Sequence, residues 1–173
     1  TGYEIITLWV SRMIMMSYFA LGEEPFKTVY LHGMILDKDG KKMSKSKGNG
    51  MDPLVMTEKY GADAVRLSLL MGYTPGNDAR FSEDKIESKR NFINKLWNIS
   101  RFIIDYSGSY LQKDLNIKDL NIETSADKWI LESLLDTIEK TEENLENYNF
   151  SLAAEALNDF TWNKLADWYL EVA

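Results

Sequence analysis

The sequence predicts a mainly α-helical protein, with a small α/β part first and a helical bundle after it. Three long segments, residues 82–106, 125–147 and 150–172, carry apolar residues at helical spacing. One short run, residues 28–36, is rich in β-branched and aromatic residues. Because short connections make successive helices antiparallel neighbours, the second half is expected to form a bundle.

The chain opens with a predicted helix and a predicted strand. Residues 3–19 place apolar side chains at mixed helical spacings, which predicts an almost wholly buried helix that ends at Gly22. The run at residues 28–36 is typical of a buried strand. A turn at residues 37–40 and a lysine-rich loop that reaches Asn49 should follow it.

Two short helices are predicted after the lysine-rich loop. Asp52 and Pro53 are residue types of a helix N-cap and a first helical position, so a helix should run from there to about Tyr60. Gly61 is the expected end of this helix. A second helix should follow over residues 62–71.

Turn formers over residues 72–80 mark the best candidate for a domain boundary. The long helix that follows carries an apolar stripe that should face a core. The stripe consists of Ile86, Ile93, Trp97 and Ile104. A polar connection over residues 107–124 is expected to lead from this helix to the rest of the bundle.

Composition excludes several classes of protein. With 45% hydrophobic and 27% charged residues, the chain has the make-up of a soluble, ordered protein. The lack of cysteine excludes a disulfide framework and thiolate metal sites, and agrees with a cytoplasmic location. No run approaches the about 20 consecutive apolar residues that cross a bilayer, so no membrane partner is expected. Thr1 is not an initiator methionine, which suggests a chain cut from a longer one.

Charge is distributed unevenly along the chain. The net charge of -7 argues against a general nucleic-acid binder, which needs clustered Lys and Arg. Lysines nevertheless predominate between Asp37 and Gly48, so a polyanion should meet this part. Residues 111–150 are strongly acidic, and the acidic part of the predicted bundle is most simply a solvated face. Its glutamates include Glu139, Glu142, Glu143 and Glu146.

The segment with the most specific chemistry is Lys42-Met43-Ser44-Lys45-Ser46. Two lysines on a flexible loop can surround a triphosphate, because ammonium groups are compact point charges that follow phosphate oxygens. Their stabilisation would grow as charge develops on a leaving pyrophosphate. A solvated lysine turn has the same composition, so the residues around the segment must decide.

The segment resembles the KMSKS signature of class I aminoacyl-tRNA synthetases. The blocks that match around it are His32-Gly33, Gly40 to Lys42, Gly48-Asn49, Asp52-Pro53, Tyr60 to Asp63, and Arg66. The resemblance covers nearly the whole chain and narrows to the valyl branch. The narrowing blocks are Thr1 to Ile6 with Trp9, Arg12 to Met15, Thr74 to Asp78, Arg80-Phe81, Arg90 to Phe92, Asn94 to Asn98, Ser100 to Phe102, and Trp168 to Glu171.

The resemblance implies three parts. Residues 1–50 would end a Rossmann-like catalytic domain, 51–81 would be a stem-contact segment, and 82–173 a truncated, helical anticodon-binding domain. The whole enzyme would form valyl-adenylate from valine, ATP and Mg²⁺ and then esterify tRNA(Val), as a cytoplasmic monomer. The HIGH signature, on the other side of the ATP, is absent here, so the chain alone should be inactive. Residues 1–49 should then expose apolar surface or be poorly ordered.

The resemblance also assigns roles to single residues. Lys42 and Lys45 would stabilise the ATP phosphates as catalytic residues, and Trp9 would wall the amino-acid pocket. The ATP and adenylate contacts would come from Gly2, Glu4, His32, Gly33, Met43, Ser44, Lys45 and Ser46, with no metal ligands. Gly33 would let the nucleotide approach closely. The family more often has Asp in place of Glu4, which leaves the ribose geometry open. The tRNA contacts would come from Arg66, Arg90 and Arg101.

Each role has a plainer alternative. Trp9 could be a core residue, and His32 could be structural. Arg66 could form a surface ion pair with Asp63, and the other two arginines could cover the core with their aliphatic stems.

Two other functions stay open. An isoleucyl-type ligase shares the KMSKS region, and the blocks at residues 74–102 argue against it. A non-catalytic tRNA-binding protein would have no need to keep Lys42 and Lys45.

Overall fold

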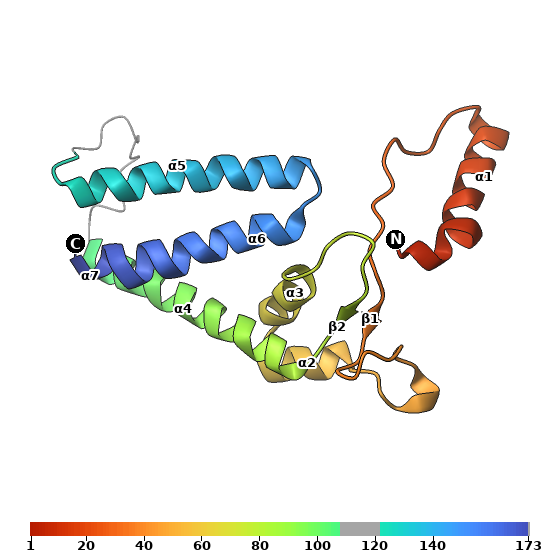
Figure 1. The fold of residues 1–173 in the computed structure, drawn as a ribbon, viewed down its shortest axis with the longest axis horizontal. Helices are drawn as coiled ribbons and strands as arrows, with labels where there is room; N and C mark the ends of the chain where they lie inside the picture. Colours follow the sequence, from red (N-terminus) through yellow and green to blue (C-terminus); the bar gives the residue numbers. More distant parts are fainter. Residues whose placement is uncertain (108–121, 173) are drawn as a thin grey trace. The chain divides into compact units, whose positions relative to one another are not determined.

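The computed structural model describes residues 1–107 and 122–172, and of Lys45 only the backbone. The chain divides into two compact units, Thr1–Asp52 with Gly72–Glu83, and Pro53–Met71 with Asp84–Ala173. Helices predominate among the described residues, which contain one two-stranded sheet (Figure 1). The prediction of a mainly α-helical fold is confirmed.

The first unit begins with a continuous helical run that changes its winding. A 3₁₀ turn, η1 (Tyr3–Ile5), leads into a π-helical stretch, η2 (Ile6–Val10), and then into α1 (Ser11–Leu21). Gly22 ends the run as predicted, because its φ of 73° is the left-handed conformation that glycine adopts without strain. The predicted bounds of this helix are therefore close to the observed ones.

The predicted burial of this helical run is wrong. Val10 is buried, whereas Leu8, Trp9 and Phe19 are 62%, 56% and 88% exposed. A helix that is apolar all round is buried only where another surface covers it, and the other described residues of the unit do not. The exposed apolar surface agrees with the expectation for residues 1–49.

The stretch Tyr3–Leu21 also bears on the expected lack of a membrane partner. Among the described residues it alone is long and apolar enough to cross a membrane by length and composition, with a mean hydropathy of 1.3. A core helix of a soluble protein passes the same test. The absence of a membrane partner therefore stays a prediction.

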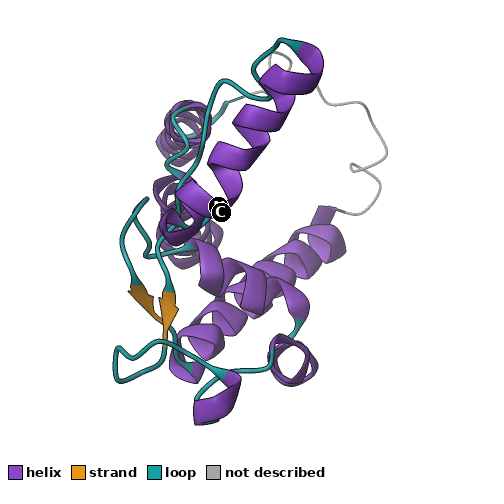
Figure 2. Cartoon of the chain, turned by 90° about the vertical axis from the view of Figure 1, so that its right-hand side faces the viewer, coloured by secondary structure: helices purple, strands orange, loops and turns teal. Residues whose placement is uncertain are grey.

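The sheet of the first unit joins two strands that are distant in sequence. Strands β1 (Ile35–Leu36) and β2 (Ala79–Arg80) pair in parallel, with Ile35 opposite Ala79 (Figure 2). The strand predicted over residues 28–36 was too long, because only its last two residues find a ladder partner. The partner strand lies in a segment rich in turn formers and was not predicted.

In the second unit, the two short helices agree with their local signals. Helix α2 (Pro53–Tyr60) begins at the predicted proline, and α3 (Ala62–Leu70) follows after one residue. That residue is Gly61, whose φ is 90° and whose N–H donates to the carbonyl of Thr57 at 2.9 Å. Glycine is favoured here because a φ of 90° is a conformation that residues with a side chain rarely adopt.

The long helices of the second unit form a bundle with its own core. They are α4 (Glu83–Ser107), α5 (Ser125–Glu146), α6 (Phe150–Asp159), the π-helical η6 (Phe160–Tyr169) and α7 (Leu170–Val172). Helices α5 and α6 run side by side in opposite directions (Figure 1). The buried apolar residues of α4 to η6 are Ile86, Phe92, Ile99, Ile130, Ala153, Ala154, Phe160 and Ala166. The predicted bundle is thus present, and its last helix continues through a π-helical stretch that was not predicted.

The predicted apolar stripe of α4 is only partly buried. Ile86 is 0% exposed, whereas Trp97 and Ile104 are 67% and 58% exposed. Farther along the helix the buried residues are Phe92 and Ile99, on another side, and the Phe92 ring lies 6.4 Å from the ring of Trp162 in η6. The stripe prediction was therefore wrong for this end, because the packing of η6 selects the covered face. The connection expected over residues 107–124 lies largely outside the described residues.

Candidate functional site

The first residues of the chain lie beside the segment that contains the only histidine. The Thr1 ammonium donates to the carbonyl of Tyr30 at 2.9 Å, and the His32 N–H donates to the carbonyl of Thr1 at 2.9 Å. The Tyr3 N–H donates back to the carbonyl of His32 at 3.3 Å, which places Gly2 opposite His32. Two blocks with expected ATP contacts are therefore adjacent. The His32 ring is exposed, and its Nδ1 lies 3.0 Å from the carbonyl of Gly33.

Gly33 is packed against backbone. A Cβ at this position would lie 1.8 Å from the carbonyl oxygen of Asn77, so only glycine fits. The close packing against residues 77–78 is thus one reason for a glycine here, and the expected contact of Gly33 with a nucleotide stays a prediction. Asp78 then ties the segment in place, since its carboxylate accepts from the Met34 N–H at 2.7 Å and from the Tyr3 hydroxyl at 3.1 Å. The hydrogen bond to Asp78 is the main cause that raises the pKa of Tyr3.

Lys42 and Glu4 form an ion pair. The Lys42 Nζ lies 3.1 Å from Oε2 and 3.2 Å from Oε1 of Glu4. The two side chains are 61% and 40% exposed, so water also reaches both of them. The pair joins the first lysine of the KMSKS-like segment to the carboxylate expected at the ribose.

Asp37 and Asn49 close the lysine-rich loop at its base. The Asn49 amide donates to Asp37 Oδ2 at 2.7 Å, and the other carboxylate oxygen accepts from the N–H groups of Asp39 and Lys41 at 3.0 and 2.7 Å. The Lys41 N–H and then the Asn49 amide are the main causes that lower the pKa of Asp37. We call this pair the Asp37–Asn49 clasp. Sequence analysis assigned no role to Asp37 or Asn49, although an Asp before a Gly-containing turn is a common local hydrogen-bond acceptor.

The motif itself lies inside the clasped loop. The Ser44 N–H donates to the Asn49 amide oxygen at 3.0 Å, and the hydroxyls of Ser44 and Ser46 lie 3.3 Å apart. Met43 and Ser44 are half-buried, and a 3₁₀ turn, η3 (Lys45–Lys47), follows them. The side chain of Lys45, a predicted catalytic group, lies outside the described part of the chain.

Comparison with protein families decides the family. Residues 1–82 match the model of the tRNA synthetases class I (I, L, M and V), and residues 127–173 match the anticodon-binding domain of tRNA ligase. The chain belongs to the class I tRNA synthetases. Its clasped lysine loop and the paired residues 1–3 and 30–32 all lie within the part that matches the synthetase model.

Individual synthetases are similar over the whole chain. It is 47% identical to the valine–tRNA ligase of Clostridium tetani and 49% identical to that of Bacillus cereus, and both alignments cover 100% of the chain. The chain spans 19% of the length of these relatives.

Two solved synthetase structures have the same fold. The first is LeuRS from Agrobacterium radiobacter in a ternary complex with tRNA and LeuAMS, which matches with a TM-score of 0.77 at 26% identity. The match covers 95% of this chain and 22% of the LeuRS chain. The second is the Mycobacterium tuberculosis methionyl-tRNA synthetase bound by methionyl-adenylate, which matches with a TM-score of 0.69 at 25% identity. The match covers 90% of this chain and 30% of the methionyl-tRNA synthetase chain.

The residue expected in the amino-acid pocket of this synthetase chain is on the surface. Trp9 lies in η2 and its side chain is 56% exposed. It is therefore not a core tryptophan among the described residues, which was the plainer alternative.

The arginines expected to contact tRNA are exposed. Arg66 on α3 lies 3.6 Å from Asp63, and both side chains are more than two-thirds exposed, at 82% and 72%. The surface ion pair expected as the plainer alternative is thus present. Arg90 and Arg101 on α4 are exposed, as are Glu139 and the other acidic residues of α5 assigned to a solvated face.

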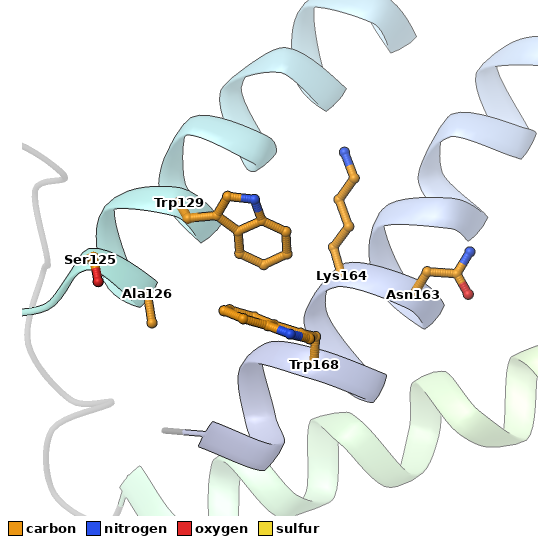
Figure 3. Close-up of a pocket in the computed structure, with 6 residues that line it drawn as sticks. All are labelled: Ser125, Ala126, Trp129, Asn163, Lys164 and Trp168. Carbon is orange, nitrogen blue, oxygen red and sulfur yellow. The ribbon is translucent and has the colours of Figure 1, made fainter.

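The described residues contain no metal cluster but do form a pocket in the helical bundle. Within residues 1–107 and 122–172, no three His, Cys, Asp or Glu side chains come together as metal ligands. A pocket of about 510 Å³ opens between α5 and η6, where the rings of Trp129 and Trp168 lie 4.6 Å apart with Lys164 beside them (Figure 3). Sequence analysis did not predict this pocket, because the two tryptophans meet only through helix packing.

Proposed function

We propose that this chain is part of a valine–tRNA ligase. The whole enzyme would activate valine with ATP to valyl-adenylate and transfer the valyl group to tRNA(Val), as a cytoplasmic monomer. The observation that carries the proposal is the 47–49% identity over the whole chain to proteins named valine–tRNA ligase. The clasped lysine loop beside Glu4 supports it.

The loop would act on the ATP phosphates. Lys42 and Lys45 would stabilise the charge that develops on the leaving pyrophosphate, with Met43, Ser44 and Ser46 lining the phosphates. Mg²⁺ would arrive with ATP as its substrate complex and neutralise part of the phosphate charge. The attacking valine carboxylate is already ionised at neutral pH, so the step needs no general base.

The segments paired through Gly2 and His32 would bind the rest of the nucleotide. Glu4 would accept hydrogen bonds from the ribose hydroxyls, since a carboxylate offers acceptors only. The exposed His32 ring would lie against the adenine. Gly33 would hold this segment to residues 77–78, where a side chain has no room. Lys42 would then exchange its contact with Glu4 for the phosphates as ATP binds.

Valine and tRNA would use other elements. The exposed indole of Trp9 offers a flat apolar wall for a small branched side chain. Residues 51–81 would contact the tRNA stem and residues 82–173 the anticodon, with Arg66, Arg90 and Arg101 as phosphate contacts. The similar LeuRS was solved as a complex with tRNA, which supports this assignment by similarity.

The test is ATP–pyrophosphate exchange by the full-length gene product that contains this chain. Exchange should depend on valine and be much slower with isoleucine, leucine or methionine. Preference for isoleucine would favour the isoleucyl-type alternative. No exchange with any of the four would favour a non-catalytic tRNA-binding protein.

The 173-residue chain alone is the second arm of this test. It should give no valine-dependent exchange, because catalysis needs groups on both sides of ATP held in place. Its binding to tRNA should be weak and fall steeply with salt. Exchange by a sample that mass spectrometry shows to contain only these residues would contradict this proposal.

A further inference from the structure

The clasp connects the sheet to the lysine motif through a continuous set of hydrogen bonds. Asp37 directly follows β1, which pairs with β2. Its carboxylate holds the turn through Asp39 and Lys41 and receives the Asn49 amide at 2.7 Å. A displacement at the base of the loop would therefore be transmitted to the motif.

Asn49 is the residue that contacts the motif. Its amide oxygen accepts from the Ser44 N–H at 3.0 Å, and its amide nitrogen lies 3.3 Å from the carbonyl of Lys42. These two contacts hold the backbone on either side of Met43. Lys42 is also bridged to Leu36, the last residue of β1. The backbone of Lys42 is thus held from both sides, while its side chain stays 61% exposed.

The direction of each hydrogen bond fixes which residue types can fill the two positions. Both oxygens of Asp37 accept, and Asn49 must both donate to Asp37 and accept from Ser44. An ionised carboxylate at position 49 would bring two acceptors within 2.7 Å of each other. An amide at position 37 that still accepts from the turn would instead bring two donors together. Exchange of the two residues restores one donor and one acceptor between positions 37 and 49, although a carboxylate at position 49 can no longer donate to the Lys42 carbonyl.

We propose that Asp37 and Asn49 are positioning residues that hold the motif backbone so that Lys42 can reach the ATP phosphates. The role rests on the proposed ligase function. In this role the two residues act through the motif backbone and not through a contact with the substrate. Their hydrogen bonds restrict the conformations of the loop before ATP binds. The loop therefore loses less conformational entropy in the transition state, and such preorganisation is a known source of rate enhancement.

The test compares five forms of the full-length enzyme: wild type, Asp37→Asn, Asn49→Asp, the exchange variant that carries both substitutions, and the control Asp39→Asn. The exchange variant has the same net charge as wild type. Asp39→Asn removes a carboxylate from the same turn and serves as the control for charge, because the hydrogen bond from Asp39 uses its backbone N–H. Exchange kinetics with valine and ATP, and hydrogen–deuterium exchange of residues 37–49, are measured on the same samples.

Each single substitution should lower kcat for pyrophosphate exchange by about 10- to 100-fold, because misplacement by about 1 Å costs that much. KM for valine should stay within about twofold, since the valine pocket keeps its contacts. Deuterium uptake at residues 37–49 should rise in both single variants. The exchange variant should recover part of kcat and of the protection, because the bond between positions 37 and 49 returns but the donor to the Lys42 carbonyl does not. Asp39→Asn should behave as wild type.

The positioning role would be overturned if the single variants were as fast as wild type, or if the exchange variant were as slow as the single variants. An active wild-type enzyme in the same experiment would leave the proposed function intact. Unchanged deuterium uptake in the single variants would overturn the clasp itself. A wild-type enzyme that gives no exchange with valine would overturn the proposed function, and the positioning role would fall with it.

Discussion

The ammonium of Lys42 contacts both carboxylate oxygens of Glu4, at 3.1 and 3.2 Å. Under the proposed function, the first motif lysine and the ribose acceptor therefore neutralise each other before ATP arrives. Both side chains are exposed to water, so the pair contributes only about 0–1 kcal/mol to stability. A nucleotide can separate the two groups at low cost.

Glu4→Gln in the full-length enzyme should raise KM for ATP several-fold and leave the melting temperature within about 4 °C of wild type. The amide is a poorer acceptor for ribose hydroxyls, and this loss should outweigh the release of Lys42 from its contact with Glu4. Glu4→Asp is the matched variant, because it keeps a carboxylate for the ribose but shortens its reach toward Lys42. A large loss of thermal stability with normal ATP kinetics would assign Glu4 a structural role.

Lys45→Ala should lower valine-dependent pyrophosphate exchange by about a hundredfold while valine binding stays nearly unchanged. The reason is that a charge acting on the developing pyrophosphate contributes mainly in the transition state. Lys38→Ala removes an exposed lysine from the neighbouring turn and should have little effect. Equal exchange rates for Lys45→Ala and Lys38→Ala would remove Lys45 from the mechanism.

Trp9→Ala should raise KM for valine in the full-length enzyme, since one apolar wall of the pocket is lost. In the 173-residue chain the same substitution should change thermal stability little, because the indole is 56% exposed. Trp97→Ala deletes another exposed indole, on α4, and is the control that should leave valine kinetics normal. Normal valine kinetics for Trp9→Ala would instead point to a packing role in the complete enzyme.

Thr124→Ala should destabilise the bundle by about 1 kcal/mol, measured by urea unfolding of the 173-residue chain. Thr124 caps α5: its hydroxyl accepts from the Asp127 N–H at 3.1 Å, and the Asp127 carboxylate accepts from the Thr124 N–H at 3.0 Å. Alanine removes the hydroxyl that satisfies one free N–H at the helix start. An unchanged unfolding midpoint would show that the cap does not stabilise α5.

Asp127→Asn should make stability less dependent on pH on the acid side. The Tyr169 hydroxyl and then Thr124 lower the pKa of Asp127 below its ordinary value of 3.8. Its ionised form therefore stabilises the fold above about that pH, and this contribution is lost as pH falls through the lowered pKa. The free energy of unfolding, measured with urea, should fall more steeply between pH 6 and pH 3 for wild type than for the variant. Glu142→Gln, on the exposed face of α5, should keep the wild-type slope.

Helix bounds were predictable because their signals are local. Pro53, Gly22 and Gly61 start or end helices through their own backbone preferences, and the structure has them in those positions. Burial was less predictable because it depends on partners far away in sequence. Trp97 carries the same periodic signal as Ile86, but only Ile86 is covered.

The residues of the candidate site also differ in how far the sequence alone predicts their roles. The residues with distinctive chemistry, such as Lys42 and Lys45, could be proposed from the sequence because their spacing matches a known signature, and their catalytic role stays a prediction. Asp37, Asn49 and Asp78 were not assigned roles, because Asp and Asn are ordinary turn residues and their significance lies in the backbone groups they contact.

The parallel pairing of β1 with β2 also sets an order of events during folding. Residues 37–78 lie between the two strands, and α2 and α3 are within this interval. Helices need only local contacts, whereas a strand pair across such an interval must first close a long loop. A ribosome that has released β1 but not Arg80 therefore presents a nascent chain whose short helices can already form and whose sheet cannot. During that interval the edge of β1 is open to wrong partners, and a pause in translation there would prolong the exposure.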